Sequence, residues 1–103
     1  MIHVVAHLTT KPGMRAEVLK HFHANMPAVH KEDGCIEYQP VVDSDAGFGA
    51  FQTKIGADSF FVIEKWRDAN ALKAHAAAPH MAAYGAKVKD MIAGRVIHIL
   101  SGA

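Results

Sequence analysis

This sequence has only one cysteine and almost no net charge. Cys35 is the single cysteine among 103 residues, so no disulfide can form within the chain, and a reducing, cytoplasmic location is expected. The net charge is only +1, and no run of Lys or Arg occurs. We therefore expect no binding to nucleic acid or to an anionic membrane surface.

Long apolar runs and cofactor fingerprints are missing too. No window approaches the ~18 apolar residues of a membrane span, so no membrane insertion is expected. The segment MIHVVAHLTTKPG has neither the positive start nor the apolar run of a signal peptide. No GxGxxG, P-loop or flavin fingerprint occurs, so no cofactor is expected. Half of the residues are hydrophobic, which favours one domain, 1–103, with a small core.

Histidine is abundant, with eight residues, but its spacing does not favour a metal site. His3 and His7 share a strand face, yet at ~3.3 Å per residue they lie ~13 Å apart, too far to share one ion. His21 and His23 diverge on a helix. No HxxxH pair on a helix and no Cys/His cluster is present, so we expect no metal.

Hydrophobic periodicity predicts the element order βαββαβ. Apolar residues alternate over 2–9 and recur at helical spacing over 14–33, where Pro27 is expected to kink the helix. Further strands are expected at 35–43, 60–66 and 95–101, and a helix split by Pro79 at 69–77 and 79–92. This is the ferredoxin-like α+β pattern, with a four-stranded antiparallel sheet and the helices on one face.

Two features of this pattern concern the edges of the sheet. Pro40 suggests that the second strand is an edge strand or contains a bulge. Residues 44–59, SDAGFGAFQTKIGADS, are long for a hairpin connection. We expect residues 47–53 to form a short strand or an arm.

One apolar face of the sheet is expected to lack a cover. Phe61 and Ile63 alternate with Val62 and Trp66, so Tyr38, Val62 and Trp66 are not all expected beneath the helices. Large exposed apolar patches usually mark an interface or a ligand site. The sequence therefore predicts a homodimer in which two sheets face each other and enclose a cavity.

Four segments, PGMRAEVL, GCIEYQPVVD, VIEKW and LKAHAAAPHMAAY, resemble the antibiotic-biosynthesis-monooxygenase family of dimeric α+β barrels. The resemblance covers nearly the whole chain. It is strongest to the bacterial quinol monooxygenases of menadiol-type quinols, which share the long connection DSDAGFGAFQTKIGADS. It implies a cofactor-independent monooxygenase or oxidase that acts on a quinol or polycyclic phenol with O₂.

The family motif of a strand Glu-x-Trp followed by a helix His is met by Glu64, Trp66 and His75. By resemblance, Trp66 is a flat wall with an N–H donor for an aromatic substrate. His75 is then the base that takes a phenolic proton. The alternative role of Trp66 is that of a core aromatic, and the alternative role of His75 is that of a surface histidine on a helix. Glu64 is costly inside a sheet unless it is paired or faces a wet cavity.

Further substrate-binding candidates complete the expected site. Glu64 or His7 would orient the base or bind a second hydroxyl. His80 and Tyr84 lie four residues apart and could line the pocket, although Tyr84 also fits the buried stripe of its helix. Tyr38 could bind the substrate or, alternatively, pack in the core. The full set of expected substrate contacts is Glu64, Tyr38, Val62, His7, His80 and Tyr84.

Three other functions remain open from the sequence. A haem-degrading enzyme on the same barrel would use an Asn from the first strand, and IHVVAHLT contains none. A non-catalytic dimer could bind a small aromatic or a signal molecule. Isomerisation of a phosphorylated signal would need a basic phosphate site, for which only the scattered Lys65, Arg67 and Arg95 are available.

Overall fold

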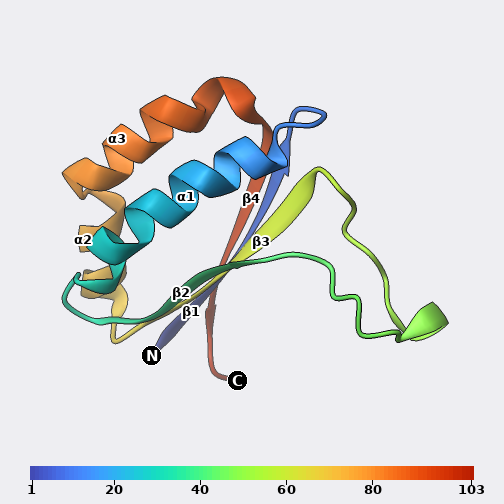
Figure 1. Ribbon diagram of the computed structural model, residues 1–103. Helices are drawn as coiled ribbons and strands as arrows, with labels where there is room; N and C mark the ends of the chain where they lie inside the picture. The colour runs from blue at the N-terminus through green and yellow to red at the C-terminus, as the bar shows by residue number, and fades with distance from the viewer.

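Four strands and three helices follow one another in the computed structural model, which describes residues 1–103. The elements labelled in Figure 1 are β1 (Ile2–Thr10), α1 (Arg15–His30), β2 (Cys35–Val41), β3 (Ser59–Trp66), α2 (Ala69–Ala76), α3 (Pro79–Val88) and β4 (Ile92–Ser101). Two short 3₁₀ turns lie at Gly49–Phe51 and Lys89–Met91.

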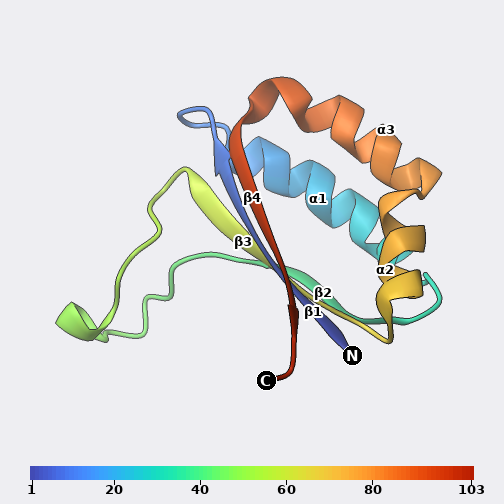
Figure 2. The ribbon, with the colours of Figure 1, turned by 180° about the vertical axis from the view of Figure 1, so that it is seen from behind.

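The strands form one antiparallel sheet in the order β2-β3-β1-β4. All three helices lie on one side of it, as both views show (Figures 1 and 2). The predicted ferredoxin-like α+β fold is confirmed. Pro40 lies in β2, which is an edge strand as predicted, and the register of that strand shifts between Cys35 and Glu37.

The helix boundaries differ from the predicted ones by a few residues. Helix α1 ends at His30 rather than at 33, and Pro27 lies inside it. Pro79 begins α3, where a missing N–H costs nothing because the first helical N–H groups have no partner. The end of α3 tightens into the 3₁₀ turn Lys89–Met91. Strand β4 therefore starts at Ile92, three residues earlier than predicted.

Gly34 allows the turn before β2 to pass close to α2. Its φ is +84°, and a Cβ at this position would lie 2.6 Å from the Cβ of Ala71. A side chain is therefore excluded both by backbone conformation and by space. The Gly34 carbonyl accepts the Arg67 N–H at 2.8 Å, which joins this turn to the end of β3.

The core lies between the sheet and the helices. Tyr38, Val62 and Trp66 are all buried there, at 4%, 4% and 0% exposure. The expectation that they could not all lie beneath the helices was wrong. Even-numbered residues of β3 face the helices, and the register pairs Tyr38 with Glu64 on this same face. It is Phe61 and Ile63 that point to the opposite side.

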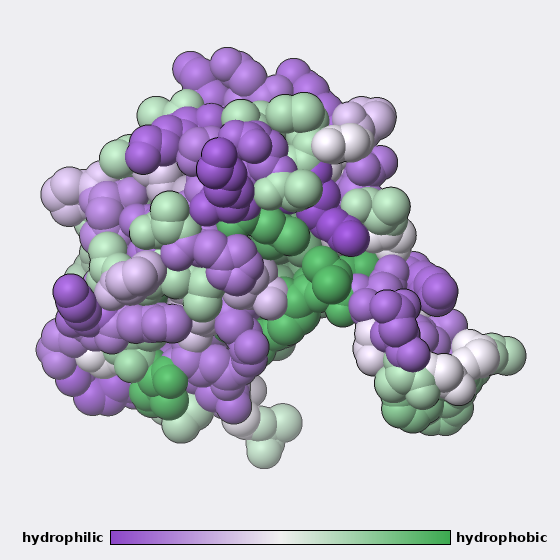
Figure 3. All heavy atoms as spheres, in the orientation of Figure 1, coloured by the Kyte–Doolittle hydropathy of each residue, from purple (hydrophilic) through white to green (hydrophobic).

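The opposite face of the sheet carries apolar residues that nothing in the chain covers. Phe61 pairs with His7 in β1, and His7 pairs with Val96 in β4. Val96 and Leu100 are 53% and 46% exposed. Figure 3 shows hydrophobic residues gathered in the hollow between the body of the chain and the connection that projects from it. We call the face of the sheet that carries His7, Phe61, Val96 and Leu100 the open face.

The connection between β2 and β3 projects from the body as an arm (Figure 1). It contains the single 3₁₀ turn Gly49–Phe51 and no strand, which selects the arm from the two predicted alternatives. Its base is tied by the Asp43 carboxylate, which accepts the N–H groups of Ile55 and Gly56 at 2.9 Å each. At its tip, Phe48 and Phe51 are 58% and 91% exposed.

Candidate functional site

A cavity of about 500 Å³ lies between the sheet and the junction of α2 with α3. Val4, Ala6 and Leu8 of β1 form part of its floor, and the small residues 76–78 leave room at its wall. Most of the lining is apolar, with the side chains of Tyr38, Glu64, His75, Tyr84 and Arg95 adding polar groups. A cavity of this size and character is typical of a small-molecule site.

His75 reaches the cavity from α2 and is held between two aromatic rings. Its ring centroid lies 4.6 Å from that of Trp66 and 5.4 Å from that of Tyr38. Its Nδ1 lies 2.8 Å from Oε2 of Glu32. Because a carboxylate only accepts hydrogen bonds, Nδ1 carries the proton. When the ring is neutral, its lone pair then lies on Nε2, the nitrogen that can act as a base.

Glu64 and Trp66 form a buried pair beside His75. The Trp66 indole N–H donates to Oε1 of Glu64 at 2.9 Å, and the indole is fully buried. Trp66 therefore backs the site and does not line the cavity, whereas Glu64 does. Burial raises the pKa of Glu64, although the Trp66 N–H and the neighbouring His75 act in the opposite direction.

Two phenols lie near this pair, and both line the cavity. Tyr38 stacks on Phe22 with ring centroids 5.1 Å apart, and Tyr84 meets Phe22 edge to face at 5.9 Å. Burial raises the pKa of Tyr84 to about 12 and raises the pKa of Tyr38 further above its ordinary value. Both phenols stay neutral near pH 7, so they can donate hydrogen bonds but do not serve as bases.

Besides Trp66, two of the expected site residues do not line the cavity. His7 lies on the open face, where its ring contacts Phe61 at 4.7 Å between centroids. His80 lines a surface hollow of about 590 Å³ beside Glu32, Asp33 and Arg67. Of the expected substrate contacts, Val62, Glu64, Tyr38 and Tyr84 line the cavity, and His7 and His80 do not.

Glu32 is the site residue that the sequence did not indicate. It lies in the turn after α1, separated by 43 residues from His75. No spacing rule links two positions so far apart, and an acidic residue after a helix is usually a solvated surface group. The one available signal is Gly34, whose positive φ and closeness to Ala71 bring this turn against α2.

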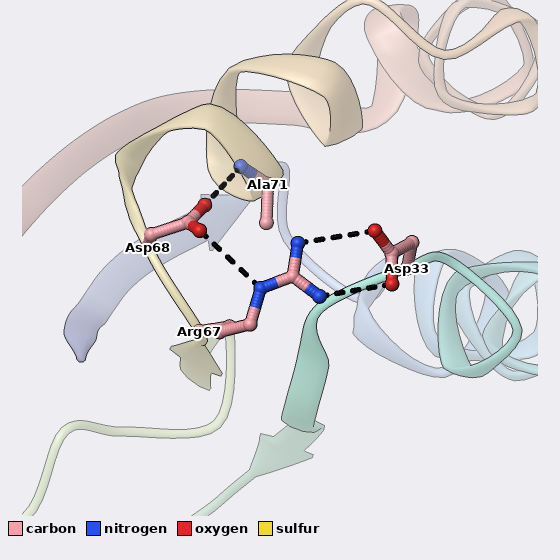
Figure 4. Close-up of polar contacts among 4 residues, drawn as sticks. All are labelled: Asp33, Arg67, Asp68 and Ala71. Carbon is pink, nitrogen blue, oxygen red and sulfur yellow. Dashed lines mark hydrogen bonds and ion pairs between the residues drawn. The ribbon is translucent and has the colours of Figure 1, made fainter.

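An exposed polar clamp holds this turn in place (Figure 4). The Arg67 guanidinium donates to both carboxylate oxygens of Asp33, at 2.9 and 3.0 Å, and to Asp68 at 3.3 Å. Asp68 also accepts the Ala71 N–H at 2.8 Å and so caps the start of α2. The Ala71 N–H and then Arg67 lower the pKa of Asp68. The clamp joins the segment of Glu32 to the helix of His75.

Two further observations concern metals and membranes. No group of three or more His, Cys, Asp or Glu side chains is arranged to hold a metal ion. None of the helices combines the length and the apolar character needed to cross a bilayer.

Residues 1–87 match the family described as antibiotic biosynthesis monooxygenase. The chain belongs to this family. It is 41% identical over 102 residues to "Probable quinol monooxygenase YgiN" of Escherichia coli (strain K12), covering 97% of this chain and 96% of that protein. Family membership and this similarity support a monooxygenase.

Solved structures agree on the fold. A protein from Caulobacter crescentus CB15 is 30% identical, with a TM-score of 0.81 over 99% of this chain and 89% of that chain. The protein PA3566 of Pseudomonas aeruginosa has a TM-score of 0.81 at 22% identity, over 99% of this chain and 93% of that chain. At that identity the likeness concerns the fold alone.

Proposed function

We propose that this monooxygenase acts without a cofactor on a quinol or polycyclic phenol, with O₂ as the second substrate. The observation that carries the proposal is the placement of His75 at the wall of an apolar cavity, with Nδ1 held by Glu32 and Nε2 left as a base. The similarity to YgiN supports a quinol as the phenolic substrate.

The cavity suits a flat aromatic ring. Its walls are mostly aliphatic and small residues, with two tyrosines among them, which favour an apolar ring over a polar substrate. The neutral Tyr38 and Tyr84 hydroxyls and the Glu64 carboxyl are available for the oxygen atoms of a quinol. Trp66 contributes from behind, because it orders both Glu64 and His75.

His75 would supply the base that the uncatalysed reaction lacks. A phenolic hydroxyl with a pKa of ~10 is ionised in only about one molecule in a thousand at pH 7. A base within hydrogen-bond reach accelerates such a proton transfer by ~10² to 10⁴. The O–H bond breaks, the proton goes to Nε2 of His75, and the electron-rich quinolate remains in a mostly apolar cavity.

The quinol itself supplies the electrons for O₂. In the oxidase outcome, the quinol loses two electrons and two protons to O₂, which gives a quinone and hydrogen peroxide. In the monooxygenase outcome, one oxygen atom replaces a ring hydrogen to give a hydroxyquinone, and the other oxygen leaves as water. Neither outcome needs a further reductant.

We also propose that the working unit is a homodimer located in the cytoplasm. The open face exposes Val96 and Leu100, and the arm carries the exposed Phe48 and Phe51 beyond the body of the chain. A second copy packed against the open face would bury these apolar groups. The single, half-buried thiol of Cys35 is compatible with a reducing compartment.

The test is O₂ uptake by metal-free protein with a panel of reduced quinones, corrected for their oxidation in buffer alone. We expect turnover of at least one naphthoquinol or polycyclic phenol, with a quinone or hydroxyquinone as product. Thermal stabilisation by such compounds without any O₂ uptake would instead identify a non-catalytic binding protein. A Soret band after addition of haemin would favour the haem-degrading alternative.

A further inference from the structure

Glu32 contacts the site from outside the cavity. It lines the surface hollow, and its side chain is only 15% exposed. Its Oε2 atom lies 2.8 Å from Nδ1 of His75 and 3.1 Å from Nε2 of His80. One carboxylate oxygen is thus shared by a histidine of α2, which reaches the cavity, and a histidine of α3, which does not.

Several charged and titratable groups face Glu32 from the surrounding elements. The negative charge of Glu32 contributes to the raised pKa values of Cys35, Tyr38 and Glu64. Arg67, in the same hollow, is already engaged by Asp33 and Asp68. The groups around the carboxylate are His75, His80, Cys35, Tyr38, Glu64, Lys31, Asp33 and Arg67.

Of these groups, His75 alone makes a hydrogen bond with the Glu32 carboxylate. The contact of His80 with Glu32 is short, but its geometry is not that of a hydrogen bond. Both ring nitrogens of His80 are buried and have no hydrogen-bond partner. A buried imidazole without partners is costly. A protonated His80 would be a second, charged partner for Oε2 of Glu32, the atom that His75 contacts. A test of Glu32 must therefore distinguish an effect through His75 from an effect through His80.

We propose that Glu32 is a positioning residue for His75, which fixes the Nδ1–H tautomer and stabilises the imidazolium formed when Nε2 takes the substrate proton. The proposal rests on the function proposed above, because it assigns that proton transfer to Nε2. Glu32 itself touches neither the cavity nor the substrate. It acts through the His75 ring, by orientation before the proton transfer and by charge after it.

Kinetics of Glu32→Gln test this role. The substitution keeps the size of the side chain and removes its charge. We expect kcat to fall by roughly 10- to 100-fold, a part of the ~10² to 10⁴ that a base contributes, with KM within about threefold of wild type. Glu37→Gln is the matched control, because Glu37 is a partly exposed carboxylate of β2 that pairs with Lys65 and lies outside the cavity. It should leave kcat unchanged.

A double-mutant cycle shows through which histidine Glu32 acts. In a His75→Gln background, Glu32→Gln should cause no further loss of kcat. In a His80→Asn background, the loss should persist in full. An equal loss with and without His75 overturns the proposal, and a loss that disappears only without His80 does so as well.

The tautomer can be measured without any turnover. In ¹⁵N NMR spectra of the wild-type protein, the neutral His75 ring should show a protonated Nδ1 and a free Nε2. Glu32→Gln should give a mixture of tautomers, because an amide both accepts and donates. A protonated Nε2 in the wild type overturns the proposal whatever the activity. If quinol-dependent O₂ uptake is absent while the tautomer changes as expected, the substrate assignment fails and the positioning role stands.

Discussion

Trp66 donates its indole N–H to Oε1 of Glu64 across 2.9 Å, and both side chains are buried beneath the helices. The pair places the one donor of the indole on a carboxylate of the same strand. Glu64 is thereby held at the cavity, and the face of Trp66 is left to pack against the His75 ring at 4.6 Å. The donor that the sequence assigned to the substrate serves the protein itself.

Trp66→Phe should therefore reduce stability first and substrate binding second. The variant keeps a ring against His75 but leaves Oε1 of Glu64 buried without its donor, at a cost of roughly 1–3 kcal/mol. Urea unfolding of Trp66→Phe, Glu64→Gln and the double variant measures this coupling. The cost of Trp66→Phe should be smaller in the Glu64→Gln background. Equal costs in both backgrounds would show that the charge of Glu64 does not strengthen the hydrogen bond from the Trp66 N–H.

Glu64→Gln should make the protein more stable at pH 7. Burial raises the pKa of Glu64 above its ordinary value of 4.5, so the folded state holds this proton more tightly than the unfolded state does. Stability from this group is therefore present below pH 4.5 and is lost as pH rises toward the raised value. The amide oxygen of Gln still accepts from Trp66 but carries no charge.

Melting temperatures between pH 4 and pH 8 check this sign. The wild type should lose stability relative to Glu64→Gln as the pH rises through the window above 4.5. The matched control is Glu37→Gln, since hydrogen bonds from Lys65 and Gln39 lower the pKa of this carboxylate and outweigh the opposing effect of its partial burial. A melting temperature of Glu64→Gln below that of the wild type at pH 7 would contradict the prediction.

Sequence patterns found the fold because its signals are local. Alternation in β1 and β3 and helical spacing in α1 follow directly from which side chains face the core. The same alternation already separated His7 from Ala6, and Ala6 proves to line the cavity while His7 lies on the open face. Strand alternation therefore already indicated that His7 and Ala6 lie on opposite faces of β1, although His7 was expected to contact the substrate.

The rest of the site depends on contacts between distant segments. Glu32 meets His75 across 43 residues only because Gly34 brings its turn close to Ala71 and Arg67 bridges Asp33 to Asp68. The arm has no periodicity from which its course could be predicted. Glu64, Trp66 and His75 were brought together by the resemblance to the family motif, in which two residues share a strand and the third follows on the next helix.

His75→Gln should reduce kcat by roughly 10² to 10⁴, the range that a general base contributes. In the wild type, the rate should also fall toward acid pH, because a protonated imidazole cannot accept the substrate proton. This acid limb should be absent from the residual rate of His75→Gln. His23→Gln, on the exposed side of α1, is the control, and it should keep both the wild-type rate and its fall toward acid pH. An unchanged acid limb in His75→Gln would mean that another group is the base.

Val96→Asp should convert the proposed homodimer to a monomer. Val96 lies on the open face beside His7, and a carboxylate there would be buried by the second sheet at a large cost. Light scattering at micromolar concentration should give the mass of two chains for the wild type and of one chain for the variant. Ala86→Asp, on an exposed position of α3, should stay dimeric. A monomeric wild type would end the proposal of an interface above the ~1,000 Å² of specific association.

Phe51→Ser should weaken that dimer without affecting the fold of a single chain. Phe51 is 91% exposed, and its ring centroid lies 6.5 Å from that of Phe48 at the tip of the arm. Full burial of one Phe stabilises an interface by about 1.5–3 kcal/mol, and a symmetric homodimer has two copies of Phe51, so the dimer dissociation constant should rise by roughly 10²- to 10⁴-fold. Sedimentation over a dilution series measures this change, with Gln52→Ser at the neighbouring position as the control. An unchanged dissociation constant would mean that the arm does not reach the partner, even if the open face does.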